Sequence, residues 1–548
     1  MKKNLLFLLL LCFSLHRVSA QCAEQNQTKI LMMGDSWAYF MHFEQTLNQV
    51  MAKWGHSNVK YVSNGTLSEN GTQTDDFLKA DKKNAFLAAL AQNPDIEIVH
   101  LSIGGNDMLG DWKKSFTQGH TDTLRHEVLL RLDSIVQFIK AAKPGIKILW
   151  SGYTYPNFEE PVTSPGLFTG SNHPFYGTWS DMEFPNFLEI NTVLNDVSTD
   201  MIAYTSTEPD VYFVNATGIL QYTTGQSSPL CCGIQPQGTY AAHSVSLPLG
   251  DPNYPSPMST MRDYLGLTKD CFHLSPGGYI DFVGYHAQKF YQKALMDDKY
   301  LLSADNAQTG FVSSTGNTAD SLVLGEASGE QFATVLSFNT TTMADTTLAK
   351  ASLFLRRKSS TGSNPVNGSL EVKVKSGNFG ATVNVEATDF NAASDASGTP
   401  CQFGTNSNGN WIRLDLPASL YPFITNNAET QFVVSAPGFT GGTVVFNNSS
   451  DPDFAPVLNL KYGVVSGVEE IGGSALFSIY PNPAGNTISI NTNGEAIRNI
   501  ELTDVLGKVL IKPVVNSNSI DISTLSNGVY IMNVTTAKGI SSQKFIKQ

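Results

Sequence analysis

A serine, a histidine and an aspartate occupy positions in this sequence from which their side chains could act together. Ser36 ends the tripeptide Gly-Asp-Ser, which directly follows the largely apolar segment "KILMM", residues 29–33. Asp270 and His273 stand three residues apart in the segment "DCFH". At that spacing a carboxylate can accept a hydrogen bond from one imidazole nitrogen while the other nitrogen faces a serine hydroxyl. The pattern therefore indicates a nucleophilic serine, a histidine base and an aspartate that orients the base.

Attack by a serine on a carbonyl group also needs hydrogen-bond donors for the oxyanion that forms. The segment "IGGND", residues 103–107, follows another apolar stretch, and its Asn106 offers a side-chain amide N–H. Taken singly, the three segments have simpler interpretations. Gly, Asp, Asn and Ser are common in tight turns, and an Asp before a helix is a common cap. Only their combination favours catalysis.

The elements that would position these residues follow from the hydrophobic pattern of residues 29–296. Short apolar segments alternate with segments of helical periodicity. The apolar segments are 29–33, 59–63, 96–103, 146–150 and 211–214, and the helical ones are 43–54, 75–92, 124–139 and 275–295. This alternation predicts a parallel sheet with helices on both faces. Reactive groups gather at the carboxyl ends of such strands, where Ser36 and Asn106 would lie.

The N-terminal residues predict export. Residues 1–20 combine two lysines, an apolar core and a final Val-Ser-Ala, which is typical of a signal peptide and too short to span a bilayer. Gln21 before Cys22 disfavours a lipid anchor, and a membrane-spanning N-terminus is the alternative. No later segment is long and apolar enough to cross a membrane. The formal charge of −13 argues against nucleic acids or anionic lipid surfaces as partners.

The cysteines leave the disulfide pattern open. Exported chains can form disulfides. Cys12 lies in the predicted signal peptide, which leaves an odd set: Cys22, Cys231, Cys232, Cys271 and Cys401. One option is a bridge from Cys231 or Cys232 to Cys271. No CxxC pair or HExxH motif suggests a metal site, and we expect no metal or organic cofactor.

The sequence pattern changes after about residue 300. Residues 301–463 contain short alternating strands separated by Gly, Asn, Ser and Thr turns, which predicts a β-sandwich. Residues 464–475, "VVSGVEEIGGSA", are expected to be a linker. Residues 476–548 predict a further small set of strands, a second β-sandwich.

Residues 29–296 resemble the SGNH (GDSL) hydrolase family. Its sequence blocks match "GDSWA", a glycine in "NGTQTDDFL", "GGND" and "DCFH". The resemblance implies a three-layer, flavodoxin-like α/β domain over residues 21–300. It also implies that Ser36 is the nucleophile, His273 the base and Asp270 the acid that orients the base.

The same resemblance implies an oxyanion hole built from the Ser36 backbone N–H, the Gly71 N–H and the Asn106 side chain. Gly65 is an alternative to Gly71, because "SNGTLSENGTQT" contains both. We expect Gly71, since the residues that follow it match the family pattern better. Trp37 stands where the family name has leucine, at a position beyond the chemistry.

Other aromatic and histidine residues are ambiguous. Five aromatic residues could line an acyl or sugar pocket or could simply pack in the core: Trp37, Trp112, Tyr153, Tyr155 and Phe175. Six histidines lack a carboxylate at a telling spacing and are expected to be structural or exposed: His42, His56, His100, His173, His243 and His286.

Residues 476–548 resemble the C-terminal sorting domain of the Bacteroidetes type IX secretion system. The matching segments are "YPNP", "DVLGK" and "LSNGVY". The resemblance implies passage across the outer membrane by the type IX machinery, with release or attachment to the cell surface. An ordinary immunoglobulin-like module is the alternative. Residues 301–463 loosely resemble jelly-roll carbohydrate-binding modules, and a plain spacer is the alternative.

Together these features predict an exported serine esterase that hydrolyses carboxylic esters through an acyl-enzyme. Export and the sugar-binding resemblance favour acylated polysaccharide as substrate, with acetyl groups removed. A lipase- or phospholipase-type acyl-hydrolase acting on lipid is the first alternative. A surface glycan-binding protein without catalytic activity is the second.

Overall fold

The computed structural model describes residue 22 and residues 24–548, apart from 226–249, 345–346, 406, 464–476, 493–495, 505–507, 512–518 and 537–538. The predicted signal peptide and linker lie outside the described residues, as do Cys231, Cys232 and His243. The chain divides into two compact units, Met1–Tyr462 and Gly463–Gln548.

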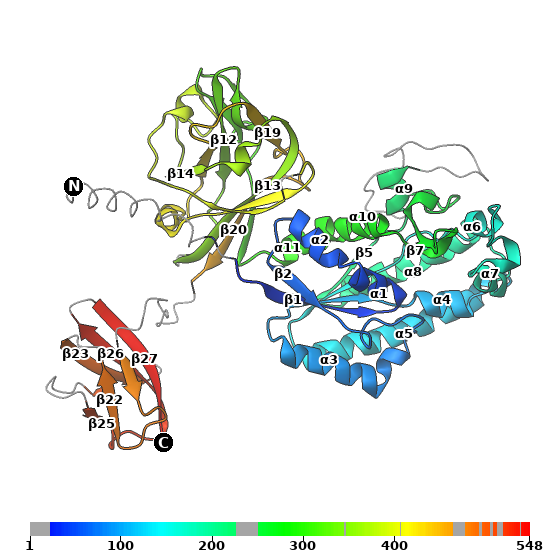
Figure 1. Ribbon diagram of the computed structural model, residues 1–548, viewed down its shortest axis with the longest axis horizontal. Coiled ribbons are helices and arrows are strands. Elements are labelled where there is room, and N and C mark those ends of the chain that lie inside the picture. The colour runs from blue at the N-terminus through cyan, green and yellow to red at the C-terminus, as the bar shows by residue number, and fades with distance from the viewer. Residues whose placement is uncertain are drawn as a thin grey trace, which may run out of the picture. The chain divides into compact units, whose positions relative to one another are not determined.

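A parallel five-stranded sheet forms the centre of the first part of unit 1 (Figure 1). Its strand order is β2-β1-β3-β4-β5. The strands are β1 (Gln27–Gly34), β2 (Val59–Val62), β3 (Ile98–Ser102), β4 (Lys147–Ser151) and β5 (Val211–Val214). The strand order reverses between β1 and β3, because β2 lies on one side of β1 and all later strands on the other. In open α/β sheets, ligands bind at this reversal, outside the carboxyl ends of the strands.

Helices cover both faces of the sheet, as the alternating pattern predicted (Figure 1). Successive side chains of a strand point to opposite faces. Accordingly Ile30 and Met32 of β1 belong to one buried core, and Leu31 and Met33 belong to the other. The first core is covered by α1 (Ser36–Phe43), α2 (Thr46–Lys53), α9 (Ile219–Thr224) and α10 (Pro276–His286). The second is covered by α3 (Ala80–Gln92), α5 (Gln118–Ala142) and α8 (Phe187–Thr207).

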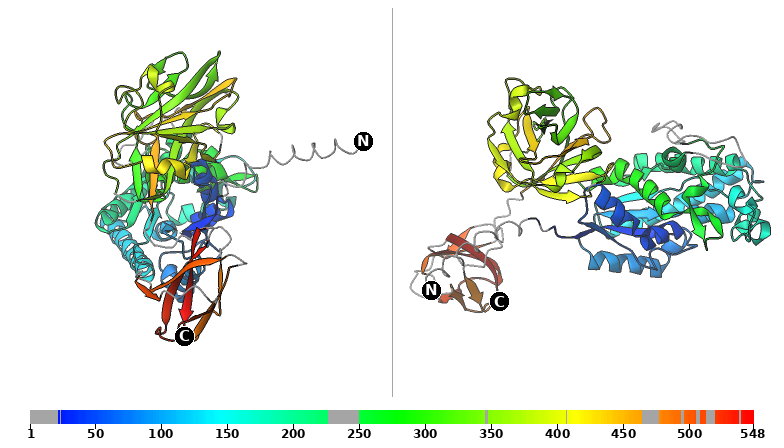
Figure 2. Two further views of the ribbon diagram at one scale, coloured as in Figure 1. Left: turned by 90° about the vertical axis from the view of Figure 1, so that its left-hand side faces the viewer. Right: turned by 45° about the horizontal axis from the view of Figure 1, so that its top comes forward.

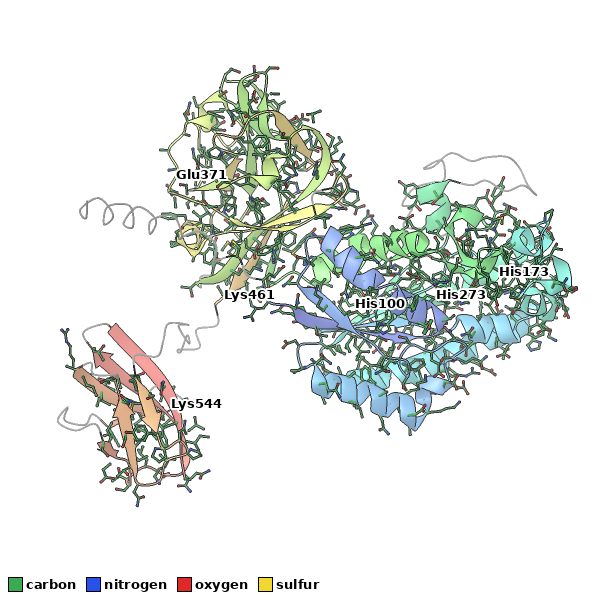
Figure 3. All side chains as sticks on the ribbon, viewed as in Figure 1. His100, His173, His273, Glu371, Lys461 and Lys544 are labelled. Atoms are coloured by element: carbon green, nitrogen blue, oxygen red, sulfur yellow. A yellow bond between two sulfur atoms is a disulfide. The ribbon has the colours of Figure 1, made fainter. Side chains whose placement is uncertain are left out.

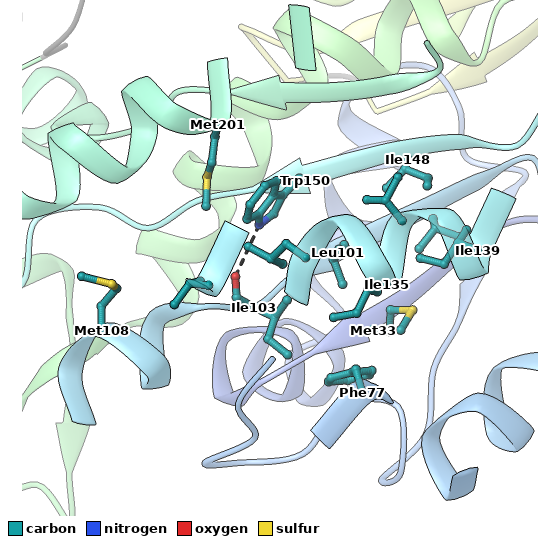
Figure 4. Packing of buried hydrophobic residues seen from close by; sticks show 14 of the residues in the cluster. Met33, Phe77, Leu101, Ile103, Met108, Ile135, Ile139, Ile148, Trp150 and Met201 are labelled. Atoms are coloured by element: carbon teal, nitrogen blue, oxygen red, sulfur yellow. Dashed lines mark hydrogen bonds between the residues drawn. The ribbon is translucent and has the colours of Figure 1, made fainter. Parts of the chain in front are cut away.

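Figure 4 shows the second core from close by. Trp150 of β4 is fully buried there, and its indole N–H donates to the Ile103 carbonyl at 3.3 Å. Ile135 and Ile139 come from α5 and pack onto the sheet, as their helical spacing predicted.

Local structure departs from the prediction at three places. Residues 43–54, expected as one helix, are divided between α1 and α2, with Gln45 in a left-handed conformation at φ 56° between them. Residues 75–92 divide into a 3₁₀ turn (Asp76–Leu78) and α3. Residues 268–274, for which the sequence predicted no strand, form β7 (Thr268–Leu274), which pairs antiparallel with β6 (Met261–Tyr264). The remaining short helices are α4 (Gly105–Asp111), α6 (Glu159–Thr163), α7 (Tyr176–Asp181) and α11 (Gln292–Ala294), with a π-helix at Ala287–Tyr291.

Antiparallel strands dominate unit 1 after residue 298, which confirms the predicted change to β structure. The long strand β13 (Leu348–Gly362) pairs with both β19 and β17, so thirteen strands form one connected network. The others are β8 (Lys299–Leu302), β9 (Gly310–Ser313), β10 (Thr318–Ala319), β11 (Leu322–Ala327), β12 (Glu330–Phe338), β14 (Glu371–Ser376), β15 (Ala396–Gly398), β16 (Cys401–Gly404), β17 (Trp411–Asp415), β18 (Thr430–Ser435), β19 (Gly442–Phe446) and β20 (Val457–Tyr462).

The α/β region and this β-rich region are joined inside unit 1, and both views of Figure 2 show them adjoining. Cys22 and Cys401 form a disulfide. Trp54 stacks on Trp411 with ring centroids 5.8 Å apart. Arg413 pairs with Glu24 and donates to the Gly55 carbonyl at 3.2 Å.

The predicted option of a bridge to Cys271 is wrong. Cys271 is a free thiol and is fully buried in the second core of the sheet. Its sulfur lies 3.9 Å from both the Phe158 carbonyl and the His173 ring. The disulfide that the structure does contain joins Cys22 to Cys401, 379 positions away in the sequence.

Unit 2 is a small β structure with its own core. Ile488, Ile500, Met532 and Phe545 are buried in it. Its strands are β21 (Ser478–Tyr480), β22 (Thr487–Asn491), β23 (Ile497–Asp504), β24 (Val509–Ile511), β25 (Ser519–Asp521), β26 (Gly528–Thr536) and β27 (Gly539–Lys547). Within the described ranges of the whole chain, no helix has the length and apolar character needed to cross a membrane.

Candidate active site

Ser36 is the first residue of α1 and directly follows the turn at the end of β1. The turn is possible because residue 34 is glycine: a Cβ there would lie 1.9 Å from the Ser102 carbonyl oxygen. Asp35 caps the helix, since its Oδ1 accepts from the Trp37 N–H at 2.9 Å. The Trp37 side chain is fully buried in the first core. Strand, turn and buried indole thus fix the Ser36 backbone.

Ser36, His273 and Asp270 form a continuous hydrogen-bonded line. The Ser36 Oγ lies 2.7 Å from His273 Nε2, and His273 Nδ1 lies 2.8 Å from Asp270 Oδ2. With a neutral ring, Nδ1–H donates to the carboxylate and Nε2 accepts from the serine hydroxyl. In Figure 3, His273 lies farther from the β-rich region than His100 does, toward the end of the α/β region.

The close approach of Asp270 and His273 on a strand has a local cause. Asp270 Oδ1 accepts from the backbone N–H groups of Phe272 at 2.8 Å and His273 at 2.7 Å. These two bonds fold the strand end around the carboxylate and leave Oδ2 for the imidazole. The phenyl rings of Phe40 and Phe175 flank His273, with centroids 4.8 and 5.9 Å from its ring. The histidine is therefore held by hydrogen bonds at both ring nitrogens and by packing against two phenyl rings.

Asn106 and Gly71 face the same cavity as Ser36. Asn106 lies in the first turn of α4, and its Nδ2 donates one hydrogen to the Thr72 carbonyl at 2.9 Å. The amide has a second hydrogen that this bond does not use. Gly71 has a left-handed φ of 78°, which suits glycine. Gly65, the alternative to Gly71, is not among the residues that line the cavity.

Asp107 ties the Gly71 loop to α4. The carboxylate is fully buried and accepts from the Thr74 backbone N–H at 3.0 Å and from the Thr74 hydroxyl at 2.6 Å. Arg131 of α5 donates to it at 3.1 Å. Burial raises the pKa of Asp107, and the bonds from Thr74 oppose that rise. The sequence interpretation assigned no role to this residue.

The cavity beside Ser36 has a volume of about 710 Å³. Of the five aromatic residues predicted as pocket or core, only Phe175 lines it. The other four are buried elsewhere: Trp37, Trp112, Tyr153 and Tyr155. Sequence reasoning missed most of the lining, in particular Phe40 of α1 and four residues of the β6–β7 hairpin, Arg262, Asp263, Tyr264 and Leu265.

None of the other described histidines lines the cavity. His56, His100 and His286 are fully buried, and burial lowers the pKa of each, to about 3, 3 and 4 respectively. His100 contacts the Tyr291 hydroxyl at 2.7 Å and the Ser151 hydroxyl at 2.9 Å. Such contacts are those of neutral core histidines.

A family model described as a secretion system C-terminal sorting domain matches residues 478–548. This match confirms the predicted sorting domain. The chain is therefore exported by the type IX secretion system, to the cell surface or beyond it. No curated protein matches the chain in sequence.

Several solved structures are similar to parts of the chain. A family 3 carbohydrate esterase from Talaromyces cellulolyticus is 14% identical over 49% of this chain and 98% of its own, with a TM-score of 0.26. The family 3 carbohydrate esterase of Clostridium thermocellum gives 14% identity, 49% and 99% coverage and the same TM-score, 0.26. PorZ of the Porphyromonas gingivalis type IX secretion system gives 18% identity over 18% of this chain and 14% of its own, with a TM-score of 0.12. Similarities of this strength do not define a function, which must come from the site itself.

Proposed function

We propose that this protein is an exported serine esterase of the SGNH (GDSL) type. The observation that carries the proposal is the line from Ser36 Oγ to His273 Nε2, 2.7 Å, and from His273 Nδ1 to Asp270 Oδ2, 2.8 Å. The line opens onto a cavity that Asn106 and Gly71 also line. Four chain segments far apart in sequence thus supply the groups that acyl transfer requires.

In the acylation step, the Ser36 oxygen attacks the ester carbonyl carbon while His273 Nε2 takes the hydroxyl proton. Asp270 stabilises the imidazolium that forms. The carbonyl oxygen becomes an oxyanion, for which Ser36 N–H, Gly71 N–H and the free Asn106 amide hydrogen are the donors. The tetrahedral intermediate then expels the alcohol, which takes the proton from His273. The acyl group stays on Ser36.

Deacylation repeats these steps with water. His273 takes a proton from water, whose oxygen attacks the acyl-enzyme carbonyl, and the oxyanion is again stabilised by the same donors. Collapse of the intermediate returns the proton to the Ser36 oxygen and releases a carboxylic acid. Apart from the ester and the water, every group that this proposed cycle needs is a residue of the protein.

We favour acetylated polysaccharide as the substrate. A cavity of about 710 Å³ is far larger than an acetyl group and has room for a sugar-sized alcohol. Its lining combines aromatic faces, Phe40 and Phe175, with charged groups, Arg262, Asp263 and Asp181, that can hydrogen-bond hydroxyls. This mixture of stacking surfaces and polar groups suits a sugar.

A lipid acyl-hydrolase is the second candidate, and one observation favours it. The tip of the β6–β7 hairpin carries Leu265 and Leu267, which are 75% and 53% exposed. Leu167, 70% exposed, lies in a neighbouring loop: a Cβ added to Gly166 would lie 4.0 Å from the Leu267 carbonyl oxygen. Of these leucines Leu265 also lines the cavity, and exposed leucines beside a cavity suit an apolar chain or a lipid surface.

We further propose the domain division 21–300, 301–463 and 476–548, with residues 301–463 as a jelly-roll β-sandwich that binds glycan. Retention of the purified protein on insoluble polysaccharides, with the Ser36→Ala variant to prevent turnover, tests that role. No binding to any glycan would favour a spacer. The third reading, a glycan-binding protein without catalysis, is disfavoured by the intact line from Ser36 to Asp270.

The deciding experiment compares wild-type protein with Ser36→Ala on p-nitrophenyl acetate. We expect hydrolysis by the wild type and none above background by the variant. Equal rates would overturn the esterase proposal. Acetylated xylan, pectin and phospholipid then separate the substrate classes, and a preference for phospholipid would favour the second candidate over the first.

A further inference from the structure

Asp35 is a buried carboxylate that the proposed mechanism does not use. It is fully buried, directly precedes Ser36, and its Oδ1 is occupied by the Trp37 N–H. Its Oδ2 accepts from the Tyr153 hydroxyl at 2.5 Å. Burial raises the pKa of Asp35 to about 6, while the bond from Tyr153 opposes the rise. A carboxylate buried in this way is stabilised by its hydrogen-bond donors, which here are the Trp37 N–H and the Tyr153 hydroxyl.

Tyr153 links this carboxylate to the opposite side of the site. Its hydroxyl accepts from the Gly105 backbone N–H at 2.8 Å, and Gly105 directly precedes Asn106. A hydroxyl has one hydrogen, which Asp35 takes, so the direction of both bonds is fixed. Tyr153 is only 6% exposed and does not line the cavity.

The packing around Gly105 supports the same link. A Cβ on Gly105 would lie 2.6 Å from the Tyr153 Cζ atom and 2.9 Å from its hydroxyl oxygen. The second glycine of "GGND" therefore permits the tyrosine to approach the backbone. Ser36 and Asn106 lie at the ends of different strands, β1 and β3, and the tyrosine hydroxyl bridges the residues that precede them.

We propose that Tyr153, with Asp35 as its acceptor, is a positioning residue that sets Asn106 relative to Ser36. This inference rests on the proposed esterase function. Removing the hydroxyl leaves Oδ2 of Asp35 and the Gly105 N–H without their partner, and the two loops can then move apart. The oxyanion is the species that needs both loops at once, so the loss falls on the transition state and not on substrate binding.

The test is Tyr153→Phe in the full-length protein, assayed on p-nitrophenyl acetate over a range of concentrations. We expect kcat to fall by ~10- to 100-fold while KM stays within about twofold, because misplacement by about 1 Å can cost ~100-fold in rate. Tyr155→Phe is the matched control. Tyr155 is a fully buried tyrosine two positions along, and its hydroxyl contacts Asn195 at 3.2 Å, away from both loops. We expect Tyr155→Phe to keep the wild-type kcat.

Three outcomes would overturn the inference: an unchanged kcat in Tyr153→Phe, a raised KM with unchanged kcat, or equal losses of kcat in both tyrosine variants. Should Tyr153→Phe fail to fold, as judged by its thermal unfolding, Asp35→Asn replaces it. An amide at position 35 can offer the tyrosine a donor in place of the acceptor, so it too should lower kcat with KM unchanged, and a wild-type kcat would refute the link. Loss of the proposed function itself gives a different result, namely Ser36→Ala as active as wild type.

Discussion

Replacing Asp107 by alanine should both loosen the site and destabilise the fold. The carboxylate is the acceptor for the Thr74 N–H and the Thr74 hydroxyl, and both Asp107 and Thr74 are fully buried. Each buried donor left without an acceptor costs about 1–3 kcal/mol, so Asp107→Ala should lower the free energy of unfolding by about 2–6 kcal/mol. Arg131 adds little, because its side chain is 31% exposed and can be solvated.

The catalytic effect follows from what Asp107 connects. Without it, the loop that carries Gly71 loses its two bonds from Thr74 to Asp107 and is held to the helix that carries Asn106 by weaker contacts, chiefly the bond from Asn106 to the Thr72 carbonyl. Loss of a single oxyanion donor lowers kcat by ~100- to 1,000-fold, which is the upper limit for this variant. Urea unfolding measures the first effect, and hydrolysis of p-nitrophenyl acetate measures the second.

Arg131→Gln is the control for the ion pair. It keeps both Thr74 bonds and should cost less than about 1 kcal/mol, with kcat close to wild type. If Arg131→Gln were as damaging as Asp107→Ala, the ion pair and not the loop attachment would be responsible. If Asp107→Ala unfolded like the wild type with the same kcat, the role assigned to Asp107 would be wrong.

Three further predictions concern the carboxylate that orients the base, one buried histidine and the hairpin tip. Asp270→Asn should lower kcat on p-nitrophenyl acetate by up to ~10⁴-fold with little change in KM, since the amide no longer holds the required His273 tautomer; a loss of less than tenfold would contradict this. His100 has a pKa lowered by burial from 6.5 to about 3, so between these values the unfolded chain binds a proton that the native state does not. The free energy of unfolding must then fall as the pH falls below 6.5, and His100→Gln should flatten that slope by up to about 1.4 kcal/mol per pH unit in urea titrations; an unchanged slope would show that His100 does not contribute. If the hairpin tip contacts acyl chains, Leu265→Ser should lower kcat/KM on p-nitrophenyl octanoate several-fold while leaving thermal stability and p-nitrophenyl acetate hydrolysis unchanged. The same ratio of variant to wild-type kcat/KM on both esters would remove the support for lipid substrates.

The sequence was sufficient to predict the five strands of the parallel sheet and the three side chains that the structure brings together, those of Ser36, Asp270 and His273. Apolar runs and helical spacing depend on local side-chain pattern, and the strand ends carry Ser36 and Asn106 where the topology brings them together. Asp270 and His273 were visible because their interaction spans only three residues. Their placement on a strand was not, because hydrogen bonds from the chain to the Asp270 carboxylate shape that strand end.

Other features depend on contacts that no local pattern records. Cys22 and Cys401 are 379 residues apart, and nothing in their neighbourhoods marks them as partners. The β6–β7 hairpin turns at Leu265 and Gly266, both with positive φ, 54° and 69°. Such turns usually carry Asn-Gly or Asp-Gly. Because this one carries Leu-Gly, the sequence pattern did not predict the hairpin or the cavity residues that it contributes. Tyr153 was recognised as an aromatic residue, but its hydrogen bonds across two loops follow only from the fold.

The junction between the α/β and β-rich regions has a practical consequence for anyone who trims this protein. Residue 300 marks a change of secondary structure, yet Trp54, Arg413 and the Cys22–Cys401 bond hold together chain lying on either side of it. A fragment ending there would expose the Trp54 indole and leave the Cys22 thiol unpaired. Both changes favour aggregation, the first through apolar contact and the second through intermolecular disulfides. A shortened form of the protein for crystallography should therefore extend to Tyr462.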